Sequence, residues 1–362
     1  MKEYKINQIG FTLVEVLLVV TMFTIILSSV ISLTTNQILE SDLAAKSLEV
    51  TSLLETARNN SATGYRGDVW SIKVLDSDAL CQNSGDCILL FKGNNFSTRD
   101  TAYDRFVQFD VDVSGVYVNV DQENEFYFAY SSGWLATTSA AYLDQQYIVL
   151  NSNFGQKESI LIYPTGVIST FVCGEDKLFD INGNGYTTVQ IGNQCWMAEN
   201  LNTGTMLASA SIDPSDDGTI QKWCYSDTSS NCNSYGGLYD IVELLAYNTS
   251  DSQGICPAGW HIPTEAEINT LESNYSNGVD EGYNLRLGGI SGFNLPFSGQ
   301  ITKSTNAYAD ITTLSTIWSS YYTGTQGKVY YINDSVDADV LTALLTASPS
   351  DKGYAARCLK DY

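Results

Sequence analysis

A long apolar run near the N-terminus constrains this chain more than any other feature of its sequence. Residues 11–33 read FTLVEVLLVVTMFTIILSSVISL and contain one charged side chain, Glu15. A helix of this length spans about 35 Å at ~1.5 Å per residue, which is enough to cross a bilayer. A carboxylate inside such a span costs about 2.5–3.5 kcal/mol, so Glu15 is expected to have a partner or a function. The run therefore predicts a membrane-spanning helix with one functional acid.

The residues around Glu15 resemble a processing signal. A leader containing Lys2 and Lys5 ends at Gly10, and Phe11 opens the apolar run. No A-x-A cleavage site follows the run, as one would in a secretory signal peptide. The pattern resembles the N-terminus of type IV pilins and pseudopilins. That resemblance implies cleavage after Gly10 by a prepilin peptidase, N-methylation of Phe11, and pairing of Glu15 with the N-terminal amine of a neighbouring subunit. The alternative is a plain membrane anchor or an uncleaved signal peptide.

A helical pattern continues after the apolar run. Apolar residues recur mostly every three or four positions between Ile38 and Ala57, which is typical of an amphipathic helix. Asn59, Asn60 and then Gly64 supply a stop. We therefore expect a leader over residues 1–10 and a long pilin helix over residues 11–65, with residues 11–33 in the membrane.

Residues 66–170 contain short β-rich runs separated by Gly, Asn and Asp, such as the runs at 69–75, 87–91 and 105–120. This pattern predicts a pilin-like antiparallel β domain against which the helix packs. Cys81 and Cys87 flank a turn-rich stretch, and a local disulfide is the simplest pairing. A zinc site is disfavoured, because the cysteine spacing is wrong and no histidine is near.

Residues 173–362 are richer in Gly, Asn, Ser, Tyr and Trp. Several of their motifs, in this order, resemble the Fibrobacter succinogenes major paralogous domain: TTVQIGNQCWMAENL (187–201), KWCYSDTSSNCNSYGGLYD (222–240), GICPAGWHIPTEAEINTLE (254–272), IWSS (317–320) and GYAARCLKD (353–361). The sequence departs from the family pattern at 241–243. The resemblance implies a C-type-lectin-like fold. The expected fold class is therefore α+β, with a long pilin helix on an antiparallel sheet followed by a lectin-like α+β domain.

Local signals in this region favour structural roles. Thr264 and Glu267 have the spacing of a capping box, which predicts a helix starting after Thr264. Three disulfides are expected, although six cysteines permit many connectivities. The expected pairs are Cys256–Cys358, Cys224–Cys232 and, by remainder, Cys173–Cys195.

Signals for catalysis and metal binding are weak, so no enzyme activity, cofactor or metal site is expected. His261 is the one histidine, and its place beside Trp260 favours packing over catalysis. The loop that starts at Asp180 resembles a calcium loop, but Ile191 stands where an EF-hand needs Glu. A calcium site at Asp213, Asp216 and Asp217 is kept as a weak option against the interpretation of a solvated loop.

Sugar binding is the sharper alternative for the distal region. Trp318, Tyr321 and Tyr322 are amphipathic aromatic residues that could stack on a ligand if they are exposed. The competing interpretation is that Trp318 belongs to the core and that the tyrosines alternate between strand faces. A lectin-like fold does not by itself imply lectin activity.

The charge distribution disfavours one class of function, nucleic-acid binding. Of the net charge of −23, residues 1–63 contribute −2, residues 64–172 contribute −7 and residues 173–362 contribute −14. Nucleic-acid binding needs a basic face, so it is not expected. The eight cysteines, none before position 81, favour an oxidising compartment.

Together these features predict a type IV pilus subunit in a minor or tip position, because a distal domain this large would be bulky on every subunit. The expected partners are other pilin subunits, a prepilin peptidase, the inner membrane before assembly, and a surface glycan or protein at the distal domain. The globular domains are expected outside the cytoplasm, at the cell surface or on the pilus. The alternatives are a type II secretion pseudopilin and a membrane-anchored carbohydrate-binding protein.

Overall fold

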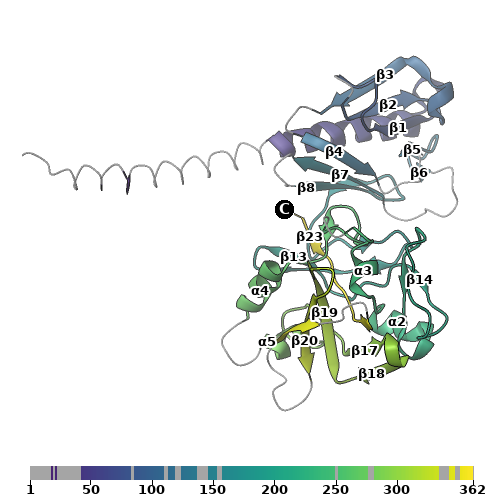
Figure 1. The fold of residues 1–362 in the computed structure, drawn as a ribbon. Helices are drawn as coiled ribbons and strands as arrows, with labels where there is room; N and C mark the ends of the chain where they lie inside the picture. The colour runs from purple at the N-terminus through teal and green to yellow at the C-terminus, as the bar shows by residue number, and fades with distance from the viewer. Residues whose placement is uncertain are drawn as a thin grey trace, which may run out of the picture.

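The fold is known from a computed structural model of the chain (Figure 1). It describes residues 18, 21–22, 42–82, 85–109, 113–118, 124–136, 146–152, 157–248, 252–275, 281–333, 342–346 and 351–361. Most of the expected membrane span at 11–33 thus lies outside the described residues. Among those that are described, no helix is both long and apolar enough to cross a membrane.

The first region is built on a helix over residues 42–63. The buried residues along one side of it are Leu43, Val50, Leu54 and Ala57. They are spaced seven, four and three positions apart. This spacing places them on a single helical face. The helix stops at Gly64, whose φ of 65° is left-handed and therefore suits a residue without Cβ.

Two antiparallel sheets enclose this apolar face. The first sheet has the order β3-β2-β1-β5-β6 and the second has the order β4-β7-β8-β9. Both sheets and the helix contribute to one apolar core. The strands are β1 (Trp70–Leu75), β2 (Cys87–Lys92), β3 (Asp100–Gln108), β4 (Val113–Val118), β5 (Glu125–Phe128), β6 (Leu135–Ala136), β7 (Gln146–Ser152), β8 (Lys157–Ile162) and β9 (Ile168–Thr170).

The second region, from residue 173 onward, is made of small sheets joined by turns. Its sheets have the orders β10-β11, β12-β13-β23-β16, β14-β15, β18-β17-β22 and β19-β20-β21, and all but β14-β15 are antiparallel. The strands are β10 (Leu178–Phe179), β11 (Gly185–Tyr186), β12 (Thr188–Ile191), β13 (Gln194–Met197), β14 (Thr205–Met206), β15 (Gln221–Lys222), β16 (Trp260–His261), β17 (Ser298–Thr302), β18 (Ala307–Ile311), β19 (Leu314–Tyr322), β20 (Gly327–Asn333), β21 (Thr342–Thr346), β22 (Lys352–Gly353) and β23 (Leu359–Lys360). The helices are α2 (Ser229–Tyr235), α3 (Ile241–Leu244), α4 (Glu265–Ser273) and α5 (Glu281–Leu285). The capping box predicted at Thr264 and Glu267 is confirmed at the start of α4.

The two regions share a buried junction. Strand side chains alternate between faces, and Ile148 and Leu150 of β7 point into the core under the helix. Tyr147 and Val149, their neighbours on the same strand, instead pack into the core of the second region. Phe171, at the connection, meets the Trp260 ring edge to face at 5.7 Å. The sheet that contains β7 is therefore covered on both faces, which fixes the two regions against each other.

The expected fold class is wrong. Over the described residues the chain is mostly β-sheet, its sheets are mostly small and antiparallel, and its longest helix has about 22 residues. This finding corrects the expected α+β class, including the lectin-like α+β domain. Of the helix expected over 11–65, the described part is a helix over 42–63, and most of residues 11–41 lie outside the described residues. The physical reason is the length of the distal apolar runs. They extend over only a few residues between Gly and Asn turns, and such runs form strands more readily than helices. Even the helix behind the capping box has only nine residues.

Candidate functional site

Four disulfides hold the described residues together. They join Cys81 to Cys87, Cys173 to Cys195, Cys224 to Cys232 and Cys256 to Cys358, which are the pairs expected from the sequence. No cysteine is left free. Because such bonds persist in oxidising compartments, they indicate that both regions lie outside the cytoplasm.

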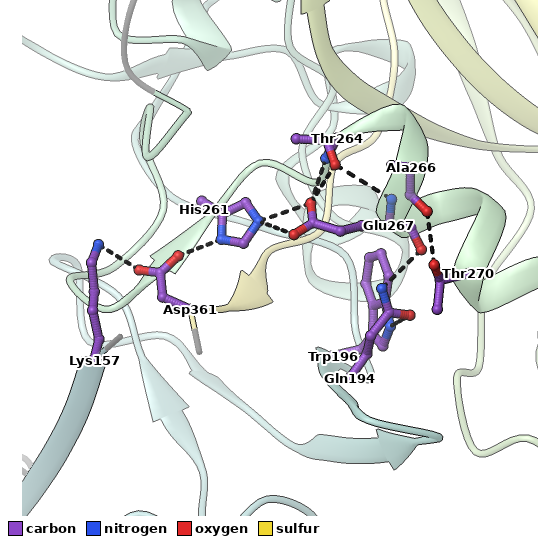
Figure 2. A network of polar contacts seen from close by, with 9 residues as sticks. All are labelled: Lys157, Gln194, Trp196, His261, Thr264, Ala266, Glu267, Thr270 and Asp361. Atoms are coloured by element: carbon purple, nitrogen blue, oxygen red, sulfur yellow. Dashed lines mark hydrogen bonds and ion pairs between the residues drawn. The ribbon is translucent and has the colours of Figure 1, made fainter. Parts of the chain in front are cut away.

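A network of charged side chains lies at the junction, with His261 at its centre (Figure 2). Strand β16 pairs with β23, with His261 opposite Leu359, and this register brings Asp361 beside the imidazole. His261 Nδ1 donates to Asp361 Oδ1, and Nε2 lies 3.0 Å from Glu267 Oε2. Lys157, the first residue of β8, donates from Nζ to Asp361 Oδ2 at 2.6 Å. The network therefore connects the first region to the last residues of the second.

The cap of helix α4 positions Glu267. The backbone N–H of Thr264 donates to Glu267 Oε2 at 2.8 Å, and the Thr264 hydroxyl donates to the same oxygen at 2.7 Å. The Glu267 carboxylate thus caps the start of α4 and also accepts a hydrogen bond from the His261 imidazole. Burial alone would raise the pKa of Glu267 and of Asp361, but their hydrogen bonds with His261 hold both below the usual range.

These contacts determine what His261 can do. Burial alone would lower its pKa, but hydrogen bonds to Asp361 and Glu267 outweigh burial and raise the pKa to about 9. At neutral pH the ring is therefore an imidazolium that donates on both sides. A general base needs a neutral imidazole near the working pH. The arrangement is suited to an ion cluster that joins two regions rather than to acid–base catalysis.

In the loop that starts at Asp180, the Asp180 carboxylate accepts hydrogen bonds from groups of the protein itself. Asp180 is buried and accepts from the backbone N–H groups of Asn182 and Asn184, both at 2.9 Å. It also accepts from the Tyr186 hydroxyl at 2.6 Å and the Thr203 hydroxyl at 2.5 Å. Calcium takes six to eight oxygen ligands, whereas this carboxylate is surrounded by donors. The loop is a turn, as its failed EF-hand spacing indicated.

The weak calcium option is not supported either. Asp213 lies 3.5 Å from Lys303 Nζ, and Asp217 accepts from the Thr219 hydroxyl at 2.5 Å. Together with Asp216 they form no group suited to a metal, and the described parts of the chain contain no cluster of three or more His, Cys, Asp or Glu that could hold one.

The aromatic stacking site expected at Trp318, Tyr321 and Tyr322 is not assembled. Trp318 is fully buried on β19 and donates its indole N–H to the Tyr239 carbonyl at 2.8 Å. Tyr321 and Tyr322 are half-buried, and Tyr322 packs against the core. A ligand therefore cannot stack on the Trp318 ring, and the interpretation of Trp318 as a core residue holds.

Other residues lie outside the sequence prediction or outside the described structure. Gly10, Phe11 and Glu15 are not among the described residues, so their roles stay predictions. The sequence did not indicate Asp361 or Lys157 as partners of the His261 cluster. It also did not single out Arg357, whose guanidinium is fully buried. The capping box placed Glu267 at the start of α4 but did not indicate its contact with His261.

Two partial similarities were found, one to a solved structure and one to a family model. No curated protein matches this chain. The crystal structure of the type IV minor pilin FimU from Pseudomonas aeruginosa is similar at a TM-score of 0.26 and 14% identity, over 36% of this chain and 92% of that one. That level of similarity does not establish a shared fold. In the distal region, residues 189–360 match the family model of the Fibrobacter succinogenes major domain.

Proposed function

We propose that this protein is a type IV pilus subunit that displays its distal region outside the cell, in a minor or tip position. The observation that carries the proposal is the N-terminal sequence, in which Gly10 and Phe11 precede an apolar run with Glu15 as its one charge. In a bundle of apolar helices, a buried carboxylate is tolerable when a neighbouring ammonium neutralises it. The N-terminal amine of an adjacent subunit, exposed by cleavage after Gly10, would supply that ammonium.

The described structure supports a display role in two ways. One face of the helix over 42–63 packs into a core that it shares with two antiparallel sheets, so an anchor at the N-terminal end of this helix would hold the rest of the region as well. The apolar junction and the Lys157–Asp361–His261 cluster fix the distal region to that base. We propose no catalytic role, because His261 is held as an imidazolium at neutral pH.

Mass spectrometry of the mature protein tests the proposal. In a host with a prepilin peptidase, the wild type should lose residues 1–10 and begin with N-methylated Phe11. The Gly10→Leu variant should keep its leader, whereas Asn7→Ala, also within the leader, should be processed normally. An unmodified N-terminus at Met1 in the wild type would contradict the proposal.

The main alternative is a pseudopilin of a type II secretion system, which shares the same N-terminal signature. A gene deletion separates the two functions. Loss of secreted proteins with intact pili would favour the pseudopilin. Loss of surface attachment with normal secretion would favour the pilus subunit.

A further inference from the structure

A cavity of about 410 Å³ opens on the second region, away from the charged cluster at the junction. Its walls come from residues 184–186 at the β10–β11 turn, residues 198–202 after β13, residues 232–236 at the end of α2, and the segment after α5. Its volume lies within the range of about 300–1,000 Å³ that is usual for small-molecule sites. The sequence alone did not indicate it, because the four segments are far apart along the chain.

A buried arginine holds two of these walls. The Arg357 guanidinium donates to the Asn200 side-chain oxygen at 2.8 Å and to the backbone carbonyls of Met197, Phe293 and Asn294. Burial of a guanidinium without a bonded carboxylate costs free energy, and burial lowers the Arg357 pKa to about 9. All four hydrogen bonds go to the wall segments at 197–200 and 293–294. This charge therefore fixes the shape of the cavity.

A buried carboxylate holds a third wall. Asp180 accepts from the backbone N–H and the side-chain amide of Asn184, at 2.9 and 2.8 Å, and from the hydroxyl of Tyr186. Asn184 and Tyr186 both line the cavity. The fourth wall, at the end of α2, is anchored by the disulfide between Cys224 and Cys232. Walls fixed in advance reduce the ordering cost of binding.

The chemistry of the lining is dominated by amides. Five asparagines line the cavity: Asn184, Asn200, Asn202, Asn233 and Asn294. The amides of Asn184 and Asn200 are engaged within the protein, with Asp180, the backbone carbonyls of Asn202 and Tyr235, and Arg357. The amides of Asn202, Asn233 and Asn294 each carry a donor group beside an acceptor, which matches a hydroxyl that both donates and accepts. Glu199 is the one charged side chain among the lining residues, so an anionic ligand finds no cationic side chain to pair with in the lining. Tyr235 and Leu287 add apolar surface, and Leu287 is 67% exposed at the rim.

We propose that this cavity binds a neutral saccharide. Ring hydroxyls would exchange hydrogen bonds with Ser234 and with the amides of Asn202, Asn233 and Asn294. The C–H face of a sugar ring would pack on Tyr235 and Leu287. The walls lack the large apolar pocket that anchors a peptide side chain. The inference extends the proposed function by giving the displayed region a ligand class, but it does not depend on the N-terminal motif.

Binding is tested on the full chain, purified in a detergent without a sugar headgroup. Isothermal titration with a panel of neutral sugars (glucose, galactose, mannose, N-acetylglucosamine, cellobiose and lactose) should give saturable binding of at least one. Glucuronate, an anionic probe of similar size, should not bind. Glucosamine tests whether a positive charge alone attracts a ligand to Glu199.

Variants on α2 locate the site. Asn233 and Ser234 are exposed cavity residues, so their replacement should not affect folding. The double variant Asn233→Ala, Ser234→Ala should weaken sugar binding by about tenfold or more, through the loss of two sets of hydrogen bonds. Ser230→Ala, an exposed serine on the same helix outside the lining, is the matched control and should bind as the wild type does.

Several outcomes would overturn the proposal. These are saturable binding of none of the neutral sugars, a preference for glucuronate or glucosamine, or binding that the double variant leaves unchanged. Failure of these tests is separable from failure of the pilus proposal, because the latter is decided by the mass of the mature N-terminus.

Discussion

The two regions of this chain are stabilised in different ways. In the first, a helix and strands of up to nine residues bury a main apolar core, and a smaller apolar cluster surrounds the one disulfide, which spans six positions. In the second, many strands have only two residues. Three disulfides and several buried charged groups connect these short strands. Strands this short are not stable alone. The difference teaches that covalent and polar contacts can replace regular secondary structure where the apolar runs are short.

The largest expected effect concerns the crosslinks. The Cys256–Cys358 bond spans 102 positions, so the chain-entropy model predicts that Cys256→Ala with Cys358→Ala lowers the free energy of unfolding by about 4–5 kcal/mol. The matched pair Cys81→Ala and Cys87→Ala should cost only about 2 kcal/mol, because its loop is short. Urea unfolding followed by tryptophan fluorescence measures both. Equal losses of unfolding free energy in the two double variants would contradict the expected dependence on loop length.

The next effect tests the apolar core of the first region. Leu54 is fully buried on the helix over 42–63, so Leu54→Ala should lower the free energy of unfolding by about 3–4 kcal/mol. Leu48 on the same helix is 72% exposed, and Leu48→Ala should change it by less than about 0.5 kcal/mol. Thermal unfolding gives both values. A small loss for Leu54→Ala would show that the first region does not depend on its core.

A third effect concerns the junction and depends on pH. Hydrogen bonds raise the pKa of His261 to about 9, above its unfolded value of about 6.5. Its contribution to stability is therefore complete below pH ~6.5 and is lost as the pH rises through about 9. The loss should be on the order of 3 kcal/mol at about 1.36 kcal/mol per pKa unit.

Denaturation series from pH 6 to 10 measure this loss, with His261→Gln as the comparison. The variant should show a flatter profile over that range. A wild-type profile as flat as that of the variant would contradict the role of the ion cluster. Below pH ~5 the sign reverses, because Glu267 and Asp361 have lowered pKa values and lose their contribution as they are protonated.

The smallest expected effect measures how much the Lys157–Asp361 bond contributes to the stability of the junction, apart from its apolar contacts. Lys157 is about 25% exposed and bonds to Asp361, so Lys157→Met should cost about 1 kcal/mol. Lys177→Met, at an exposed lysine, should be nearly neutral. Hydrogen exchange should show faster opening of β8 and β23 in the first variant only. A cost as large as that of Leu54→Ala would mean that charges, not the apolar contacts, hold the regions together.

Local signals in the sequence predicted local structure well. The helix stop at Gly64, the α4 cap at Thr264 and the turn at Asp180 each depend on residues a few positions apart. The fold class was wrong because the family resemblance implied an α+β domain, whereas the short apolar runs of the described distal residues form strands. The contacts of Asp361 and Lys157 in the His261 cluster could not be predicted, because these residues lie about 100 positions away in either direction. Asp361 comes beside His261 through the pairing of β16 with β23, and Lys157 reaches Asp361 across the junction between the two regions. The cavity was missed for the same reason.

The positions of the disulfides have a mechanical consequence. Cys173 directly follows the junction and is bonded to Cys195, and Cys256 is bonded to Cys358 near the other end of the distal region. A chain pulled taut between the junction and a tethered ligand lengthens by roughly 3.4 Å for each residue released. Residues enclosed by a disulfide cannot be released in this way. Under tension, the residues between the loops, at 196–223 and 233–255, would be drawn out, whereas those within 173–195, 224–232 and 256–358 would not. The distal region would therefore lengthen much less than an uncrosslinked chain of the same number of residues.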